Sequence, residues 1–279
     1  MGHLTMNMKQ NLREHMPAKV YFFSTCLVEL MAPGAGLDAI GLIRAAGIEV
    51  LYPQAQSCCG QPAYSSGYND EARRVALAQL ALFPEPWPVV VPSGSCAGMM
   101  VHHWPRLFAD DPELSAKARE VAARVVEWSH FARDRLELAA ATESASEGGA
   151  APALRVALHT SCSARREMGC HLPGEALLRV LPGVELVEQV RAAECCGFGG
   201  MFSVRHPAIS GAMVNDKLDS LRDSGADVVV SGDCGCLLNM HHAADRRRAA
   251  GDAMPRFVHL ASFLRERQGA QDAAQQVTD

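Results

Sequence analysis

Eight of the ten cysteines form two sets of four that occur in the same order along the chain. The first set is Cys26, the adjacent pair Cys58-Cys59, and Cys96; the second is Cys162, the adjacent pair Cys195-Cys196, and Cys236. The pair is separated from the single cysteines by 31 and 36 residues in the first set and by 32 and 39 in the second. Thiolates bind soft metals and take part in redox reactions, so the matched sets predict two metal or redox sites.

The type of metal follows from the adjacent cysteines. A structural zinc site uses Cys-x2–4-Cys hooks, and neither set has that pattern. Neighbouring side chains diverge, which hinders chelation of one ion but suits two irons of an iron–sulfur cluster. Gly60 and Gly197, which follow the pairs, allow a sharp turn or a close approach to inorganic sulfide. Amides around Gly197, Gly199 and Gly200 could donate hydrogen bonds to sulfur and raise a reduction potential.

Several other residues have more than one interpretation. Cys170 and Cys234 have no counterpart in the first half and are expected to be structural, although Cys234 is near enough to Cys236 to compete as a ligand. The three glycines after Cys196 resemble part of a dinucleotide loop but lack the full G-x-G-x-x-G context. Histidines near the cysteines are expected to be exposed or to cap helices; the alternative is a role beside a cluster ligand or in proton transfer. Arginines nearby are either solvated or offset the negative charge of a thiolate-bound cluster. These residues are His102, His103, His159, His241, His242, Arg165, Arg166 and Arg205.

The elements around the cysteines also repeat. Short apolar runs at 20–23, 48–51 and 89–91 predict strands, and runs at 156–158, 184–187 and 228–230 correspond to them. Helices are expected to begin near Asn69 and Pro207, and the stripe Leu114, Ala118, Val121, Val125 and Trp128 predicts a longer helix after Asp111-Pro112. The cysteines of both sets follow predicted strands, and parallel sheets form ligand crevices at the carboxyl ends of their strands.

We therefore predict an α/β protein of two pseudo-symmetric repeats. Each repeat has a small, mainly parallel sheet flanked by helices, with the cysteine ligands at the strand carboxyl ends. The first domain is expected at 18–138 and the second at 154–265. Between them, 139–153 is rich in Ala, Ser, Glu and Gly and predicts a surface linker.

Composition excludes several classes of protein. The 279 residues are 48% hydrophobic with a net charge of −5, which is typical of a globular chain and argues against nucleic-acid binding. Neither a signal peptide nor an apolar run long enough to span a bilayer is evident, so we expect a cytoplasmic protein that reaches the inner membrane only through partners. Structural disulfides are disfavoured in that compartment.

The repeated cysteine pattern resembles the CCG, or cysteine-rich, domain. This domain is shared by the B-type component of heterodisulfide reductase, the iron–sulfur component of glycolate oxidase and the lactate-utilization A proteins. The phrases Ser93-Gly-Ser-Cys-Ala-Gly-Met99 and Glu194-Cys-Cys-Gly-Phe-Gly-Gly200 carry the resemblance, which covers roughly 18–264. The absence of ferredoxin-type Cys-x2-Cys-x2-Cys motifs makes the chain most similar to the lactate-utilization group.

The resemblance implies an electron-transfer subunit of an oxidoreductase complex that converts L-lactate to pyruvate. The implied partners are a larger ferredoxin-containing iron–sulfur protein and a third small subunit. The fullest family motif ends in Cys-x-x-Cys, whereas Met99 and Asn239 stand at the last position here. Four cysteines per repeat still suffice for one [4Fe–4S] cluster each. The alternatives are a thiol/disulfide oxidoreductase of the heterodisulfide reductase type, a glycolate oxidase-type iron–sulfur subunit, and a redox-inert metal scaffold.

Overall fold

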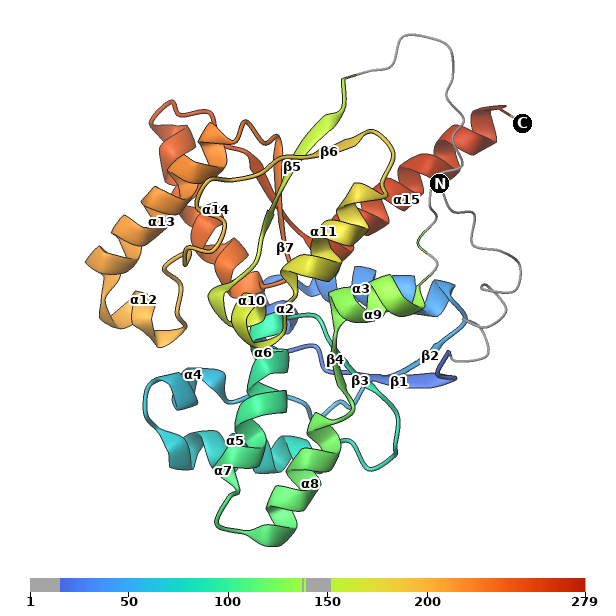
Figure 1. The fold of residues 1–279 in the computed structure, drawn as a ribbon, viewed down its shortest axis with the longest axis vertical. Coiled ribbons are helices and arrows are strands. Elements are labelled where there is room, and N and C mark those ends of the chain that lie inside the picture. Colours follow the sequence, from blue (N-terminus) through green and yellow to red (C-terminus); the bar gives the residue numbers. More distant parts are fainter. Residues whose placement is uncertain (1–15, 137, 139–151, 279) are drawn as a thin grey trace.

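The computed structural model describes residues 16–136, 138 and 152–278, and these form two lobes of similar build (Figure 1). We call 16–138 the first lobe and 152–278 the second lobe. The first lobe contains β1 (Lys19–Phe22), α2 (Cys26–Met31), α3 (Pro33–Ala45), β2 (Glu49–Leu51), α4 (Gln61–Ser65), α5 (Asn69–Leu80), β3 (Val89–Val91), α6 (Gly94–Gly98), the π-helical turn η1 (Met99–His103), α7 (Trp104–Leu107), α8 (Pro112–Ala122), β4 (Val125–Glu127) and α9 (Trp128–Arg135).

The second lobe repeats this order with fewer helices. It contains β5 (Leu154–His159), α10 (Cys162–Glu167), α11 (His171–Arg179), β6 (Val184–Leu186), α12 (Met201–Arg205), α13 (Pro207–Asp223), β7 (Val228–Ser231), α14 (Cys234–Ala249), β8 (Arg256–His259) and α15 (Leu260–Thr278). The helices predicted to begin near Asn69 and Pro207 are α5 and α13. The expected linker, 139–153, lies outside the described residues except for its last two positions.

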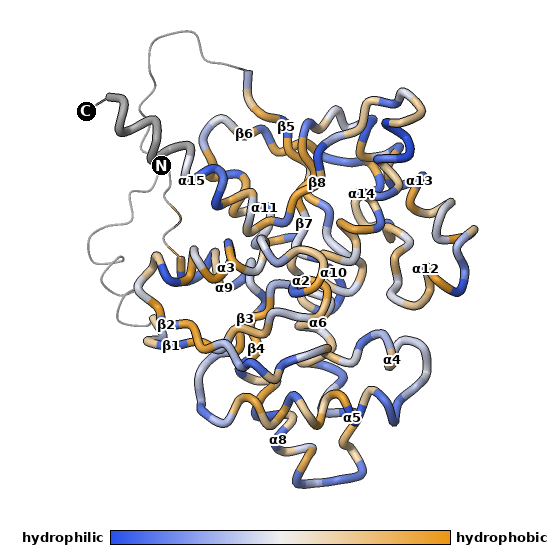
Figure 2. Tube along the Cα trace, turned by 180° about the vertical axis from the view of Figure 1, so that it is seen from behind, coloured by the Kyte–Doolittle hydropathy of each residue, from blue (hydrophilic) through white to orange (hydrophobic). Residues whose placement is uncertain are grey.

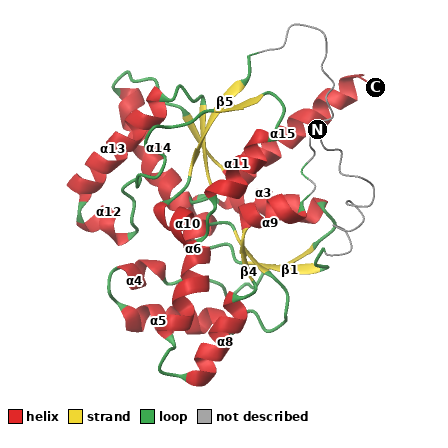
Figure 3. Ribbon diagram, viewed as in Figure 1, coloured by secondary structure: helices red, strands yellow, loops and turns green. Residues whose placement is uncertain are grey.

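Each lobe has one four-stranded, all-parallel sheet. Figure 3 shows the strands of the two sheets in yellow; their orders are β2-β1-β3-β4 and β6-β5-β7-β8, so the two sheets have the same topology. The first strand of each lobe pairs with both the second and the third strands, through registers such as Val20↔Val50 and Val156↔Val228. The second strand is therefore added on one side of the first strand and the third strand on the other side. In open parallel sheets, ligand crevices form at the point where the strand order reverses in this way. The prediction of two α/β repeats is confirmed.

The fourth strand of each sheet was not predicted. The apolar stripe expected to continue one helix through Val125 and Trp128 is instead divided: α8 ends at Ala122, β4 begins at Val125, and Trp128 opens α9. Val125 and Trp128 therefore occupy a strand and a second helix, and the prediction of one long helix was wrong. In β8, exposed Arg256 and half-buried Phe257 and Val258 did not form a distinctive apolar run.

Side chains on opposite faces of the central strands β1, β3, β5 and β7 enter different hydrophobic cores. Val20 and Phe22 join Val228 and Val230 in a central core, which also includes side chains of α3, α9, α11 and α15. Tyr21 and Phe23, on the other face of the first sheet, pack with α5, α7 and α8 in a second core, which we call the outer core of the first lobe. This alternation follows from the two-residue period of a strand. The strands accordingly appear as hydrophobic segments between helices in Figure 2.

The lobes also contact each other next to the cysteine-bearing segments. Helix α6 of the first lobe packs on α10 of the second, and α14 of the second lobe packs on α2 of the first. Gly94 permits the closest approach, because a Cβ there would lie 2.4 Å from the Cβ of Ala164. None of the described helices is long and apolar enough to cross a membrane.

Candidate metal centres

The first cysteine set converges at the carboxyl end of the first sheet. Cys26 opens α2 after β1, Cys58 and Cys59 lie in the loop after β2, and Cys96 lies in α6 after β3. The Sγ atoms of Cys26 and Cys58 are 3.6 Å apart. The Cys59 thiol in turn interacts with those of Cys58 and Cys96, and both interactions raise its pKa. All four sulfur atoms therefore form one connected group.

A hydrogen bond between Cys26 and Cys58 makes the pKa values of these two thiols differ. The Cys26 thiol donates a hydrogen bond to Cys58, and this bond is the main cause that lowers the pKa of Cys58, to about 3, and raises the pKa of Cys26. The site thus favours a thiolate at one position among thiols. Metal binding requires deprotonated sulfur, so this donor set fits a metal centre.

The second cysteine set converges in the same way. Cys162 opens α10 after β5, and its thiol interacts with that of Cys195, in the loop after β6, which raises the pKa of Cys162. The thiols of Cys195 and Cys196 interact with each other, and the sulfur atom of Cys196 lies within 4.8 Å of that of Cys236, which is in the first turn of α14. We refer to these two groups of four cysteines as the first and second quartets.

The glycine after each cysteine pair adopts a conformation that glycine favours. Gly60 has φ 89° and Gly197 has φ 81°. A Cβ at Gly197 would lie 2.7 Å from the carbonyl oxygen of Ser210, so that position also lacks space for a side chain. In this conformation the N–H of Gly60 points to Cys58 Sγ and that of Gly197 to Cys195 Sγ, each at 3.4 Å. Amide donors to sulfur stabilise a thiolate in both lobes.

Gly199 and Gly200 also have positive φ, at 53° and 60°. A Cβ at Gly200 would lie 3.9 Å from Pro62, which follows Gly60 in the first lobe. Nearby, Arg205 donates to the Tyr68 hydroxyl across the same contact. The segments after the two cysteine pairs therefore approach each other, and this places the quartets on facing sides of the lobe contact.

Different side chains fix the two paired-cysteine loops. In the first lobe the indole N–H of Trp104 donates to the carbonyl oxygen of Cys59, and in the second the amide of Asn239 donates to that of Cys196, each at 2.8 Å. Asn239 stands where the fullest form of the motif has a fifth cysteine. Met99, the corresponding residue in the first lobe, is fully buried in the outer core.

A lysine that sequence analysis missed lies beside the second quartet. Lys217 is fully buried, and its ammonium donates to the side-chain oxygen of Gln189 and to the carbonyl of Arg191. Burial is the main cause that lowers its pKa to about 8, and the neighbouring Cys196 has the opposite effect. Its burial could have been predicted from its position in α13, because it lies on the apolar face formed by Val214, Leu218 and Leu221.

The two unmatched cysteines are buried away from solvent. Cys234 lies at the start of α14, and burial is the main cause that raises its pKa to about 12. Cys170 lines a cavity of about 10 Å³ between the lobes, together with the carboxylates of Glu127 and Asp233. Sequence analysis had not singled out either carboxylate. Asp233 joins the lobes, since its Oδ1 accepts hydrogen bonds from the hydroxyls of Ser93 and Ser95, both at 2.8 Å.

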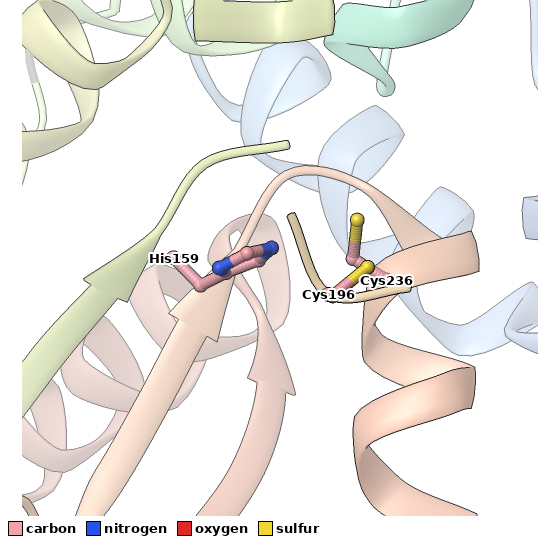
Figure 4. A group of neighbouring side chains, drawn as sticks. All are labelled: His159, Cys196 and Cys236. Carbon is pink, nitrogen blue, oxygen red and sulfur yellow. The ribbon is translucent and has the colours of Figure 1, made fainter. Parts of the chain in front are cut away.

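The five histidines singled out from the sequence have three different environments. His102 and His103 bind Glu167 of the second lobe, through its carbonyl and its carboxylate respectively, and so hold the lobes together. His241 and His242 are exposed on α14. His159 is fully buried, and a ring nitrogen lies within 4.8 Å of the sulfur atoms of both Cys196 and Cys236 (Figure 4). Desolvation is the main cause that lowers its pKa to about 3.

Comparisons with known proteins find the same repeated unit. The family model described as a cysteine-rich domain, CCG, matches residues 20–101 and 156–241. A lactate utilization protein A from Bacillus velezensis is 37% identical over 89% of this chain and all of its own length. Another from Macrococcus caseolyticus is 39% identical over 88% of this chain and 96% of its own length.

A likeness in fold is also found among solved structures. A hypothetical protein from Helicobacter pylori aligns with 94% of this chain at a TM-score of 0.59 and 11% sequence identity. This chain spans 54% of the length of that protein. At this identity the likeness concerns the fold alone.

Proposed function

The chain belongs to the cysteine-rich, or CCG, domain family, and from that membership and the two thiol quartets we propose that it is an iron–sulfur electron-transfer protein. Cys26, Cys58, Cys59 and Cys96 would hold one [4Fe–4S] cluster, and Cys162, Cys195, Cys196 and Cys236 the other. The clusters would supply one-electron redox chemistry. The observation that carries this proposal is the convergence of four sulfur atoms at the same place in each lobe.

The surrounding residues have roles that suit such centres. The amides of Gly60 and Gly197 direct their hydrogen toward a ligand sulfur. The buried ammonium of Lys217 offsets negative charge near Cys196. Trp104 and Asn239 hold the loops that carry the cysteine pairs. Fixed donors and charges of this kind tune the potential of a thiolate-bound centre.

Four ligands per centre are favoured over five. Asn239 uses its amide to bind a backbone carbonyl, and Met99 is packed in an apolar core. Neither side chain supplies a fifth thiolate at the position where the fullest motif has one. This difference supports electron transfer over the disulfide-cleaving chemistry of the heterodisulfide reductase type.

The relatives named lactate utilization protein A support a more specific proposal. We infer that the chain carries electrons during oxidation of L-lactate to pyruvate, in a complex with a ferredoxin-containing iron–sulfur protein and a third small subunit. The approach of the two paired-cysteine segments near Gly200 and Pro62 supports transfer from one centre to the other. In this proposal the complex is cytoplasmic and meets the respiratory membrane through its partners.

Metal analysis tests the iron–sulfur proposal directly. Protein purified without oxygen should contain about eight iron and about eight sulfide per chain and should give a paramagnetic resonance signal after reduction. Colourless protein that contains zinc instead would overturn the proposal. The lactate proposal has a separate test: deletion of the gene should abolish growth on L-lactate in a strain with no other lactate dehydrogenase, and undiminished growth would refute it.

A further inference from the structure

The two lobes differ in one buried residue next to the cysteines. His159 lies three residues before Cys162, and Phe23 lies three residues before Cys26, so the two occupy the same place in the repeat. Both side chains are fully buried. Phe23 packs among the apolar side chains of the outer core of its lobe, edge-on to Phe83. The fold therefore accepts an apolar ring at this position, and an imidazole is not required for packing.

The imidazole of His159 has no hydrogen-bond partner in the part of the chain that the structure describes. Neither Nδ1 nor Nε2 is paired, although both are inaccessible to solvent. An unpaired buried donor destabilises the folded state, and this cost is absent in the first lobe, where Phe23 has no polar atom in its side chain. Such a group is expected to have a partner that is not part of the polypeptide.

The direction of the ring indicates that partner. His159 extends from the end of β5 toward Cys196 and Cys236 (Figure 4), and its ligand atom and the two sulfur atoms all lie within 4.8 Å of one another. Cys196 and Cys236 are themselves buried, at 2% and 7% exposure. Any group held by these two thiolates would have the imidazole as a neighbour.

We propose that His159 donates a ring N–H to a sulfur atom of the cluster held by the second quartet and thereby raises the reduction potential of that cluster. This inference rests on the proposed iron–sulfur function. Donation is favoured over direct ligation to iron for two reasons. The four cysteines already provide one ligand for each of four irons. A histidine that binds metal also normally donates its second ring N–H to an acceptor, and the described residues provide none for His159.

The donated hydrogen would favour the more reduced state of the cluster. Reduction adds negative charge, and a hydrogen bond to sulfur stabilises that charge. The first lobe has an apolar ring at the same place, so the two clusters differ in this contact. Only the second cluster would receive a side-chain donor from this position of the repeat. The two clusters would therefore differ in reduction potential although both are held by four cysteines.

The test compares wild type with His159→Phe, which reproduces the residue of the first lobe, and with His159→Gln, which keeps an N–H donor. Anaerobic protein is titrated by potential and followed by paramagnetic resonance. The component of the resonance spectrum that is absent in Cys195→Ser is assigned to the cluster of the second lobe. We expect His159→Phe to retain the iron and sulfide of wild type and to lower the potential of the second cluster only, and His159→Gln to restore part of the difference. Exposed His242→Gln, the matched control, should leave both potentials unchanged.

A second measurement requires no substitution. Wild-type protein labelled with ¹⁵N-histidine should show a weak nitrogen coupling to the second cluster, of the size expected for a hydrogen bond. Three outcomes would each overturn the inference: absence of that coupling, a strong coupling typical of nitrogen bound to iron, and an unchanged potential in His159→Phe. The proposed iron–sulfur function would still hold in each case, provided that the wild-type protein contains the expected iron. Wild-type protein without iron would overturn both.

Discussion

The side-chain amide of Asn239 donates a 2.8 Å hydrogen bond to the carbonyl oxygen of Cys196. Asn239 lies on α14, in the same helix as the ligand candidate Cys236, and Cys196 lies in the loop after β6. The bond therefore connects two of the three segments that form the second quartet. Trp104 makes the corresponding contact with Cys59 in the first lobe. Both lobes fix the paired-cysteine loop through a carbonyl, but with unrelated side chains.

Removal of this bond should loosen the second quartet. We expect Asn239→Leu to lower the free energy of unfolding by about 1–2 kcal/mol, because the carbonyl of Cys196 loses its donor. The variant should also release iron faster from one of its two sites. Urea denaturation and the rate of iron transfer to a chelator measure the two effects. The control is Asn215→Ala: the amide of this exposed asparagine also binds a carbonyl at 2.8 Å, but away from the cysteines. Equal iron release from both variants would contradict the prediction.

Single cysteine variants should separate the two sites. Cys58→Ser and Cys195→Ser are each expected to lower the iron content by about half, because each removes one ligand from one quartet. Metal analysis and paramagnetic resonance of anaerobic protein check this outcome. Cys170→Ser is the matched control, since Cys170 lines the cavity between the lobes and belongs to neither quartet. Full iron in Cys58→Ser would show that this thiol is not a ligand.

The contact between α6 and α10 depends on the absence of a side chain at Gly94. In Gly94→Ala the new Cβ would lie 2.4 Å from Ala164 Cβ and 2.9 Å from Cys170 Sγ, so helices of different lobes must separate. We expect a loss of about 1–3 kcal/mol in the free energy of unfolding. Gly41→Ala in α3 meets no atom within 4 Å and should be neutral or stabilising by up to about 1 kcal/mol. Thermal unfolding of both variants decides the matter, and equal melting temperatures would contradict the proposed crowding.

Glu127 should make stability depend on pH. Burial is the main cause that raises its pKa from 4.5 to about 7, with a contribution from Asp233. Well below pH 4.5 the carboxyl is protonated in both folded and unfolded chains, so it adds no penalty. As the pH rises toward 7, the unfolded chain loses this proton first, and the folded state is progressively destabilised, by up to about 3 kcal/mol.

The substitution Glu127→Gln should remove this penalty. Its side-chain oxygen can still accept from the backbone N–H of Ser129, as Glu127 does at 2.8 Å. We expect the variant to be more stable than wild type at about pH 8 and the difference to shrink toward zero at about pH 4. Denaturant unfolding across that range measures it. A difference that does not change with pH would show that the Glu127 carboxyl does not titrate in this interval.

The local pattern was sufficient for the repeat and for the convergence of the cysteines. Strongly apolar runs such as 89–91 and 228–230 identify buried parallel strands, and the carboxyl ends of neighbouring parallel strands meet at one edge of a sheet. Cys26 and Cys58, separated by 31 residues, could therefore be brought together from the order of strands alone. The strands missed were β4 and β8: Val125 continues the apolar spacing of the preceding helix, and β8 is only partly buried.

The sequence by itself determined the two cysteine quartets, the glycines after each pair and the parallel order of the elements, because these depend on spacing along the chain and on the two-residue period of strands. Only the tertiary structure decided the environment of each polar side chain. His159 and Phe23 were visible as different residues in equivalent places, but the lack of a partner for the imidazole depends on which segments surround it. Burial of Glu127, Asp233 and Lys217 likewise depends on how distant elements pack, and spacing along the chain does not specify that packing.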